Sequence, residues 1–159
     1  MHRVTSAMCG LVLCTWPLLG FAQPAHLKEL QGSWVATKAE RAGAPADDVV
    51  GHRLSFADHL FRIEAQDGTT LYAGNVRVDS RAKPAAIDFE LAEGDLAGTV
   101  WKGIYALNGD TLAICDNAPD PDKQRPTAFA AESGSGYVLV TFERTNPTPP
   151  ETAHDEDHP

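Results

Sequence analysis

The stretch Leu30-Gln31-Gly32-Ser33-Trp34 (LQGSW) decides the fold, because it places a glycine two residues before a tryptophan where the first strand begins. Glycine has no side chain, so the backbone can turn close beneath the large indole ring of Trp34. The fold that surrounds Trp34 depends on how many strands follow and on how they are connected.

Strand signals dominate the chain after a short helical turn expected at residues 26–31. Ile87-Asp88-Phe89-Glu90-Leu91 alternates apolar and charged residues, which indicates a strand with one buried and one solvated face. Asp67-Gly68 and Asn108-Gly109 are typical of tight hairpins. The predicted strands are residues 33–39, 53–57, 60–65, 70–78, 85–91, 100–107, 111–116, 127–131 and 137–144.

Eight or nine short strands at nearly regular spacing indicate an all-β sandwich or barrel. Most of the connections are short hairpins, which favours an antiparallel up-and-down meander. A meander of about eight strands closes best as a barrel, since closure removes exposed strand edges. A barrel of this size is either filled by side chains or holds one small ligand.

Two features of the chain resemble lipocalin-type barrels. Those barrels carry Gly-x-Trp on the first strand, and an arginine from the last strand crosses the indole face at the closed end. Here Gly32 and Trp34 open the first strand, and Arg144 ends the last one on the same face as Phe142. The resemblance implies a lipocalin-like barrel closed by a guanidinium–indole contact worth about 0.5–2 kcal/mol. An ordinary core tryptophan with an exposed arginine is the alternative.

Four stretches in order along the chain carry a further resemblance: residues 30–34, 83–88, 103–115, and 125–129 before Gly134-Ser135-Gly136. They are similar to the planctomycete-type uncharacterised bacterial domain family, whose members are small lipocalin-like β-barrels. The resemblance implies an exported small barrel. It implies no activity, because the family has no established one. The acidic run at residues 116–122 departs from the family pattern.

Residues 1–22 have the layout of a secretory signal peptide. An apolar run at residues 7–21 follows a basic start, and small residues precede a cut after Ala22. The run is too short and too interrupted to span a membrane. A buried N-terminal helix and lipidation at Cys14 are alternatives, although bulky Leu13 disfavours lipidation. We expect a periplasmic or secreted protein without a membrane span after cleavage.

Residues 23–145 are predicted to form the barrel domain, and residues 146–159 a disordered, proline-rich acidic tail. The tail opens with Asn146-Pro147-Thr148-Pro149-Pro150, which stops any strand. Its remaining residues are too polar to order themselves. His154 and His158 lie among acidic residues there and could hold a cation only loosely.

The charge and cysteine content exclude several classes of function. The chain has 13 Lys+Arg against 22 Asp+Glu, a net charge of −9, which disfavours nucleic acid as a partner. Cys115 is the single cysteine of residues 23–159, so no disulfide can form within that part. Acidic neighbours disfavour its thiolate, and we interpret it as a buried structural residue.

No pattern in the sequence indicates catalysis, a metal or a cofactor. Ser133-Gly134-Ser135-Gly136 is a turn rather than a nucleophile elbow. The domain contains no closely spaced histidine pair for zinc, and prolines interrupt the aspartates after Cys115. We therefore expect a protein that is not an enzyme, with no cofactor and no metal site.

Binding is the working hypothesis for function, with a small, partly apolar ligand in the barrel. Arg125 is expected either to pair with Asp116 or Asp120 or to hold a ligand carboxylate at the rim. The alternatives are a solid barrel core, and an interaction protein or inhibitor that binds another exported protein through its loops or outer face. The apolar candidates for ligand contact are Phe56, Phe61, Ile63, Phe89, Tyr105 and Leu112.

Overall fold

The computed structural model describes residues 25–145, and the predicted signal peptide and tail lie outside the described residues. The short helix α1 (Ala25–Leu30) agrees with the expected helical turn. In residues 25–145, no helix is long and apolar enough to cross a membrane. The strands are β1 (Gly32–Arg41), β2 (Ala44–Pro45), β3 (Arg53–Ala57), β4 (Leu60–Glu64), β5 (Thr70–Asp79), β6 (Ala86–Leu91), β7 (Val100–Asn108), β8 (Thr111–Asp116) and β9 (Val138–Thr145).

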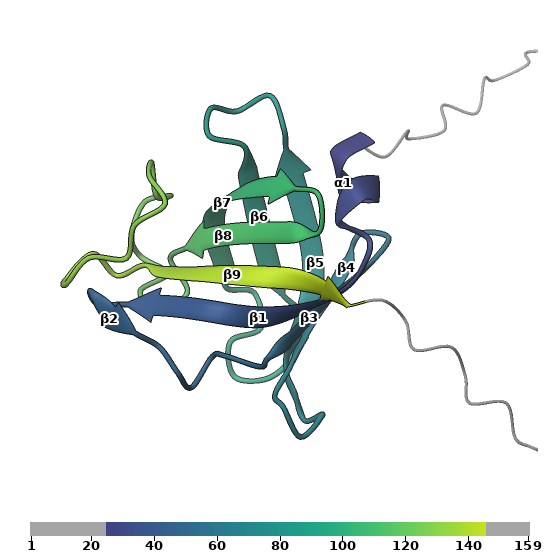
Figure 1. Cartoon of the computed structure of the whole chain (residues 1–159), viewed down its shortest axis with the longest axis horizontal. Helices are drawn as coiled ribbons and strands as arrows, with labels where there is room; N and C mark the ends of the chain where they lie inside the picture. The colour runs from purple at the N-terminus through teal and green to yellow at the C-terminus, as the bar shows by residue number, and fades with distance from the viewer. Residues whose placement is uncertain (1–24, 146–159) are drawn as a thin grey trace, which may run out of the picture.

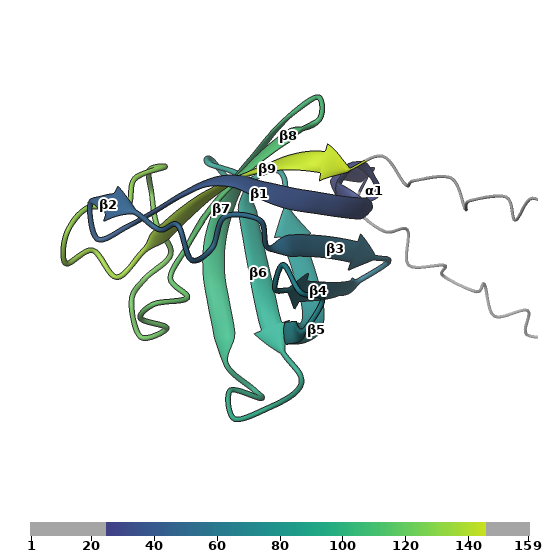
Figure 2. The same cartoon turned by 60° about the horizontal axis from the view of Figure 1, so that its bottom comes forward.

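The strands form a closed antiparallel barrel (Figures 1 and 2). From β3 to β9 each strand pairs with the next one along the chain, and β1 closes the ring by pairing with both β3 and β9. The two residues of β2 pair with the end of β1, so β2 is an addition to a ring of eight strands. The predicted all-β, up-and-down barrel is confirmed, and its architecture is compatible with a lipocalin-like barrel.

Alternation along each strand decides which side chains fill the barrel. In β6, Ile87, Phe89 and Leu91 are buried, whereas Asp88 and Glu90 between them are partly exposed. Residues that are paired across two neighbouring strands point to the same side of the sheet. The inward-facing rows of buried residues therefore continue from strand to strand around the barrel. Further buried residues of this core are Leu54, Phe56, Phe61, Val76, Trp101, Tyr105, Leu112, Ile114, Val138, Val140 and Phe142.

One end of the barrel is closed by Trp34, Arg144 and helix α1. Trp34 is fully buried, and its Nε1 donates a hydrogen bond to the Leu30 carbonyl oxygen at 2.8 Å. The Arg144 guanidinium lies over the indole, with its Cζ 4.0 Å from the ring centroid. Its Nη1 and Nη2 donate to the carbonyl oxygens of Gln31 at 2.7 Å and Glu29 at 2.8 Å. Arg144 therefore ties the last strand to the segment that precedes the first.

The backbone at Gly32 explains the glycine of the LQGSW stretch. Its φ is 102°, a conformation that residues with a side chain rarely adopt. A Cβ atom there would lie 3.7 Å from Arg144 Nη1, which is ordinary contact. The turn from α1 into β1 thus requires glycine for its backbone conformation rather than for lack of space.

The predicted strand at residues 127–131 is wrong. These residues belong to a long loop, residues 117–137, that connects β8 to β9 (Figure 1). The backbone makes isolated contacts here, such as the hydrogen bond from Gly43 N to the Ala131 carbonyl oxygen at 2.6 Å, instead of a ladder. Pro126 is buried just before this segment and lacks the donor that a strand needs.

We predict that Arg144→Ala lowers the free energy of unfolding by about 2–4 kcal/mol, because it removes the indole contact and three charge-assisted hydrogen bonds, to the Gln31 and Glu29 carbonyl oxygens and to the exposed Asp110 carboxylate. Urea denaturation measures the change. Arg77→Ala is the control, since Arg77 makes an exposed ion pair with Glu90 and its loss should cost less than about 1 kcal/mol. Equal effects of the two substitutions would show that Arg144 does not hold the closed end.

Candidate functional site

A cavity of about 330 Å³ lies in the end of the barrel opposite Trp34. Strand register places it there. Trp34 lies opposite Arg144 at the closed end, whereas Arg41, further along β1, lies opposite Val138, and both of these line the cavity. This is the end that carries the β8–β9 loop, away from α1 (Figure 1). Its apolar walls include Leu54, Ile63, Phe89, Ile114, Val140 and Phe142.

Exposed apolar side chains lie at the mouth of the cavity. Leu71, Tyr72 and Leu96 line it, and they remain 39%, 36% and 41% exposed. The Tyr72 ring also packs edge-on against Trp101, with the ring centroids 4.7 Å apart. Apolar side chains that gather in one exposed place mark binding surfaces more often than isolated ones do.

Arg41 and Asp48 form an ion pair at the mouth. Arg41 Nη2 donates to both carboxylate oxygens of Asp48, at 2.9 and 3.0 Å. Both side chains line the cavity and are well exposed, as expected for a pair at its rim. His52 lines the cavity as well. The Arg41 charge is thus already matched by Asp48.

Asp116 is the buried ionisable side chain of the cavity. It continues the inward-facing row of Leu112 and Ile114 on β8 and is 8% exposed. Its Oδ1 accepts a hydrogen bond from the backbone N of Ala118 at 2.9 Å. Burial raises the pKa of Asp116 from 3.8 to about 6, although the Ala118 bond acts in the opposite direction. At neutral pH the carboxylate is therefore mostly charged in largely apolar surroundings.

Gly103 on β7 provides the space for Asp116. The two residues lie opposite each other in the β7–β8 pair. A Cβ atom at Gly103 would lie 2.9 Å from Asp116 Cβ and 2.9 Å from the Cys115 carbonyl oxygen, which is closer than real Cβ atoms come. Any side chain at Gly103 would therefore displace Asp116 or the backbone of β8.

Trp101 presents an unused hydrogen-bond donor on the same wall. It lies on the same face of β7 as Gly103, two positions earlier, and it lines the cavity. The side chain is 5% exposed, and its Nε1 has no hydrogen-bond partner among the described residues. A buried indole N–H normally finds an acceptor, so this one is free for a ligand atom.

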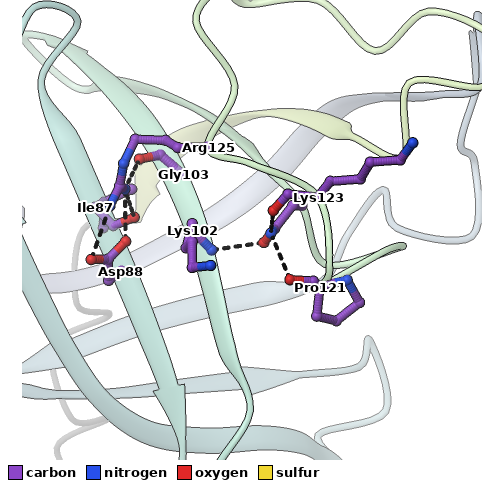
Figure 3. A network of polar contacts seen from close by, with 8 residues as sticks. Ile87, Asp88, Lys102, Gly103, Pro121, Lys123 and Arg125 are labelled. Atoms are coloured by element: carbon purple, nitrogen blue, oxygen red, sulfur yellow. Dashed lines mark hydrogen bonds and ion pairs between the residues drawn. The ribbon is translucent and has the colours of Figure 1, made fainter.

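The loop at residues 117–137 is anchored by Asn117, which is fully buried. Its Oδ1 accepts a hydrogen bond from Lys102 N at 2.7 Å, and its Nδ2 donates to the carbonyl oxygens of Lys123 at 2.7 Å and Pro121 at 3.2 Å (Figure 3). One side chain therefore fixes the start of the loop to β7 and sets the turn that follows. Ala118 and Pro119, which line the cavity, are held in place by it.

Arg125 ties the same loop to the outer face of β6 and β7 (Figure 3). Its Nη1 donates to the carbonyl oxygens of Gly103 at 2.6 Å and Ile87 at 3.2 Å. The guanidinium also pairs with the Asp88 carboxylate, with Nη1 2.6 Å from Oδ1 and Nη2 3.1 Å from Oδ2. These contacts hold the guanidinium on the outside of the barrel.

The expected partners of Arg125, Asp116 and Asp120, are therefore wrong. Asp116 faces the interior of the barrel, whereas Asp88 faces outward beside two strand carbonyls and is the nearer acceptor. Arg125 is also absent from the cavity lining, so its expected role toward a ligand carboxylate at the rim is not supported by its position.

The six apolar candidates for ligand contact divide into two groups. Ile63 and Phe89 line the cavity. The other four are buried in the barrel core outside this lining: Phe56, Phe61, Tyr105 and Leu112. The barrel is thus filled toward the closed end and hollow toward the other, and contact with a ligand stays a prediction for all six.

The sequence interpretation missed Asp116 and Trp101 as cavity residues. A signal existed for both: Asp116 has the parity of Leu112 and Ile114, and Trp101 has the parity of Tyr105. Asp116 was expected at the end of the predicted strand at residues 111–116 and was expected to pair with Arg125, so its side chain was not assigned to the interior. Asn117 was missed as well, and its role depends on loop geometry that residue spacing does not show.

Cys115 lies on the opposite face of β8 from Asp116, under the loop. It is fully buried, and its Sγ lies 3.5 Å from the Ala130 carbonyl oxygen. Burial raises the pKa of its thiol to about 11. The thiolate, which is the reactive form, is therefore scarce, and the thiol faces away from the cavity.

The cavity of the described chain brings together several groups that can contact a small molecule. Within residues 25–145, no group of three or more His, Cys, Asp and Glu side chains could hold a metal ion. The cavity combines apolar walls with a carboxylate, an indole N–H and an ion pair at its rim. This arrangement can hold a small molecule noncovalently and orient one polar end of it.

Comparisons with protein-family models, curated proteins and solved structures found no match. They neither name nor exclude the family that four stretches of the chain resemble.

We predict that Asp116→Asn stabilises the fold at neutral pH. Between pH 3.8 and about 6 the folded protein keeps a proton on Asp116 that the unfolded chain releases. The contribution of Asp116 to the free energy of unfolding is therefore greatest below pH 3.8 and is lost as the pH rises to about 6. Asparagine cannot ionise but keeps the acceptor for Ala118 N, so the gain at pH 7.5 should be about 1–3 kcal/mol.

Urea unfolding at pH 4, 5, 6 and 7.5 measures this gain, which should shrink toward zero at pH 4. Asp47→Asn, at an exposed position outside the cavity, is the charge-matched control and should lack this pH dependence. An Asp116→Asn variant that is less stable than the wild type at pH 7.5 would contradict the account of a penalised buried charge.

We also predict that the Cys115 thiol of the folded protein resists alkylation. At pH 8, a thiol with a pKa of about 11 has on the order of 100-fold less thiolate than an ordinary cysteine, and its burial slows access further. Iodoacetamide labelling followed by mass analysis of the Cys115 peptide, with and without urea, measures the ratio. Equal labelling in both conditions would show that the loop does not cover the thiol.

Proposed function

We propose that the protein binds one small, partly apolar ligand in the open end of the barrel, as a carrier or a sensor. The observation that carries this proposal is the cavity of about 330 Å³ with apolar walls and few polar groups. Ligand sites are commonly about 300–1,000 Å³ and mostly apolar, and an eight-strand barrel is wide enough for one small ligand.

The position of exposed apolar residues supports the same site. Leu71, Tyr72 and Leu96 line the cavity, whereas the other large exposed apolar residues of the described chain, Leu60 and Phe129, lie outside the lining. An apolar rim gives an apolar ligand favourable contact as it enters. The closed end offers no second entrance, because Trp34 and α1 fill it.

The proposal also says that the protein acts in the periplasm or the medium and that it binds its ligand without catalysing a reaction. Residues 1–22 support export to the periplasm or the medium by their sequence pattern alone. Binding without catalysis is supported by the position of Cys115, whose thiol is covered and faces away from the cavity. Interaction with another exported protein has weaker support, because the apolar rim surrounds a hollow rather than a filled end.

Native mass spectrometry of the mature protein, purified from the exported fraction of its host, tests the proposal. We expect a noncovalent adduct of defined mass. Val140→Trp places an indole inside the cavity and should abolish the adduct, since Val140 lines the wall. Thr141→Trp is the matched control, because Thr141 is the next residue of β9 and faces outward.

The two variants separate binding in the cavity from binding elsewhere. An adduct that survives in Val140→Trp as well as in Thr141→Trp would place the ligand outside the barrel. An adduct lost from Thr141→Trp alone would favour the outer face and hence a surface interaction. A bare mass for the wild-type protein would count against a tightly held ligand.

A further inference from the structure

Two polar groups of the cavity wall lack partners among the described residues. Asp116 uses Oδ1 for the Ala118 backbone N, and no hydrogen bond from the described chain reaches its Oδ2. The indole Nε1 of Trp101 is buried and without an acceptor. Gly103 faces Asp116, and Trp101 precedes Gly103 by two positions on the same face, so Trp101 and Asp116 are diagonal neighbours whose Cα atoms lie roughly 7–8 Å apart.

The charges that line the cavity leave one negative charge unmatched. Arg41, the cation of the lining, makes both of its short contacts to Asp48. No lysine, arginine or histidine of the described chain lies within 4.0 Å of the Asp116 carboxylate. A buried carboxylate without a cation is unfavourable, and a cationic ligand would relieve this.

The aromatic groups of the lining favour the same kind of ligand. Trp101, Tyr72, Phe89 and Phe142 all line the cavity. Their ring faces attract a cation, with the strongest effect at the indole. The net charge of −9 also draws cations toward the protein. A ligand carboxylate would instead meet Asp116 at close range, with Arg41 already occupied.

We propose, on the premise of the binding function above, that the ligand is a small apolar amine. Its ammonium group pairs with the Asp116 carboxylate, and an ether or carbonyl oxygen accepts a hydrogen bond from Trp101 Nε1. Its apolar body lies against Ile63, Val140 and Phe142. The polar end therefore binds at the β7–β8 wall, where Asp116 and Trp101 line the cavity.

Titration with naphthalene compounds of one skeleton tests this inference. The probes are 2-(6-methoxynaphthyl)ethylamine, the corresponding ethanol and the corresponding acetate, at pH 7.5 with calorimetric detection. The amine should bind at least about tenfold more tightly than the alcohol, and the acetate most weakly. A fourth probe, the amine without its methoxy group, isolates the contribution of the acceptor oxygen.

Three variants assign the preference to residues. Asp116→Asn should weaken amine binding at least about tenfold while alcohol binding changes less than about threefold. Asp47→Asn removes the same charge outside the cavity and should leave all affinities unchanged. Trp101→Phe keeps the ring but removes the donor, so it should weaken the methoxy amine and leave the amine without the methoxy group unchanged.

The outcomes distinguish this inference from the proposed function. Alcohol binding as tight as amine binding, or amine binding unchanged in Asp116→Asn, overturns the amine inference and leaves the binding function intact. A native adduct whose composition lacks a basic nitrogen does the same, whereas one with a basic nitrogen supports the inference. Absence of both probe binding and a native adduct overturns the binding function and the inference together.

Discussion

Arg144 makes the contact on which the rest of the barrel depends. It stands at the end of the last strand, yet its guanidinium bonds to the backbone just before the first strand and covers the indole of Trp34. The ring is closed by pairing of β1 with β9, and that pairing brings together residues from opposite ends of the domain. Closure of so distant a pair costs chain entropy, and local charge-assisted bonds at the junction offset part of this cost.

Aromatic side chains fill the barrel up to Phe89, and the cavity begins on the other side of this ring. Phe61 packs edge-on against Phe89 with their centroids 4.9 Å apart, and Phe56 stacks on Phe89 at 6.4 Å. Phe89 lines the cavity, whereas Phe56 and Phe61 do not. The Phe89 ring therefore forms a boundary between the packed core and the cavity.

The sequence predicted the fold well because alternation along each strand and short hairpin turns are local signals, and because Gly-x-Trp and the terminal arginine mark the two ends of the ring. Gly32, Trp34 and Arg144 carry the closed end, and the period of two in β6 assigns its inner face correctly. The loop at residues 117–137 could not be predicted, because Asn117 and Arg125 are satisfied by backbone atoms that lie far away in sequence. The site was predicted only in part. Parity alone could have placed Asp116 inside, but whether the interior is hollow depends on three-dimensional packing.

Asp116 is a residue of the cavity wall that is unfavourable for the stability of the fold. A carboxylate enclosed by apolar walls lowers stability at neutral pH, and an asparagine would keep its hydrogen bond to Ala118 without that charge. Gly103 opposite it also gives up side-chain packing, because any Cβ would collide with Asp116. Two neighbouring positions thus depart from what would stabilise the fold, and Trp101 beside them leaves a donor unpaired. Departures from good packing that cluster in one wall of a cavity are expected where a site serves a ligand rather than the fold.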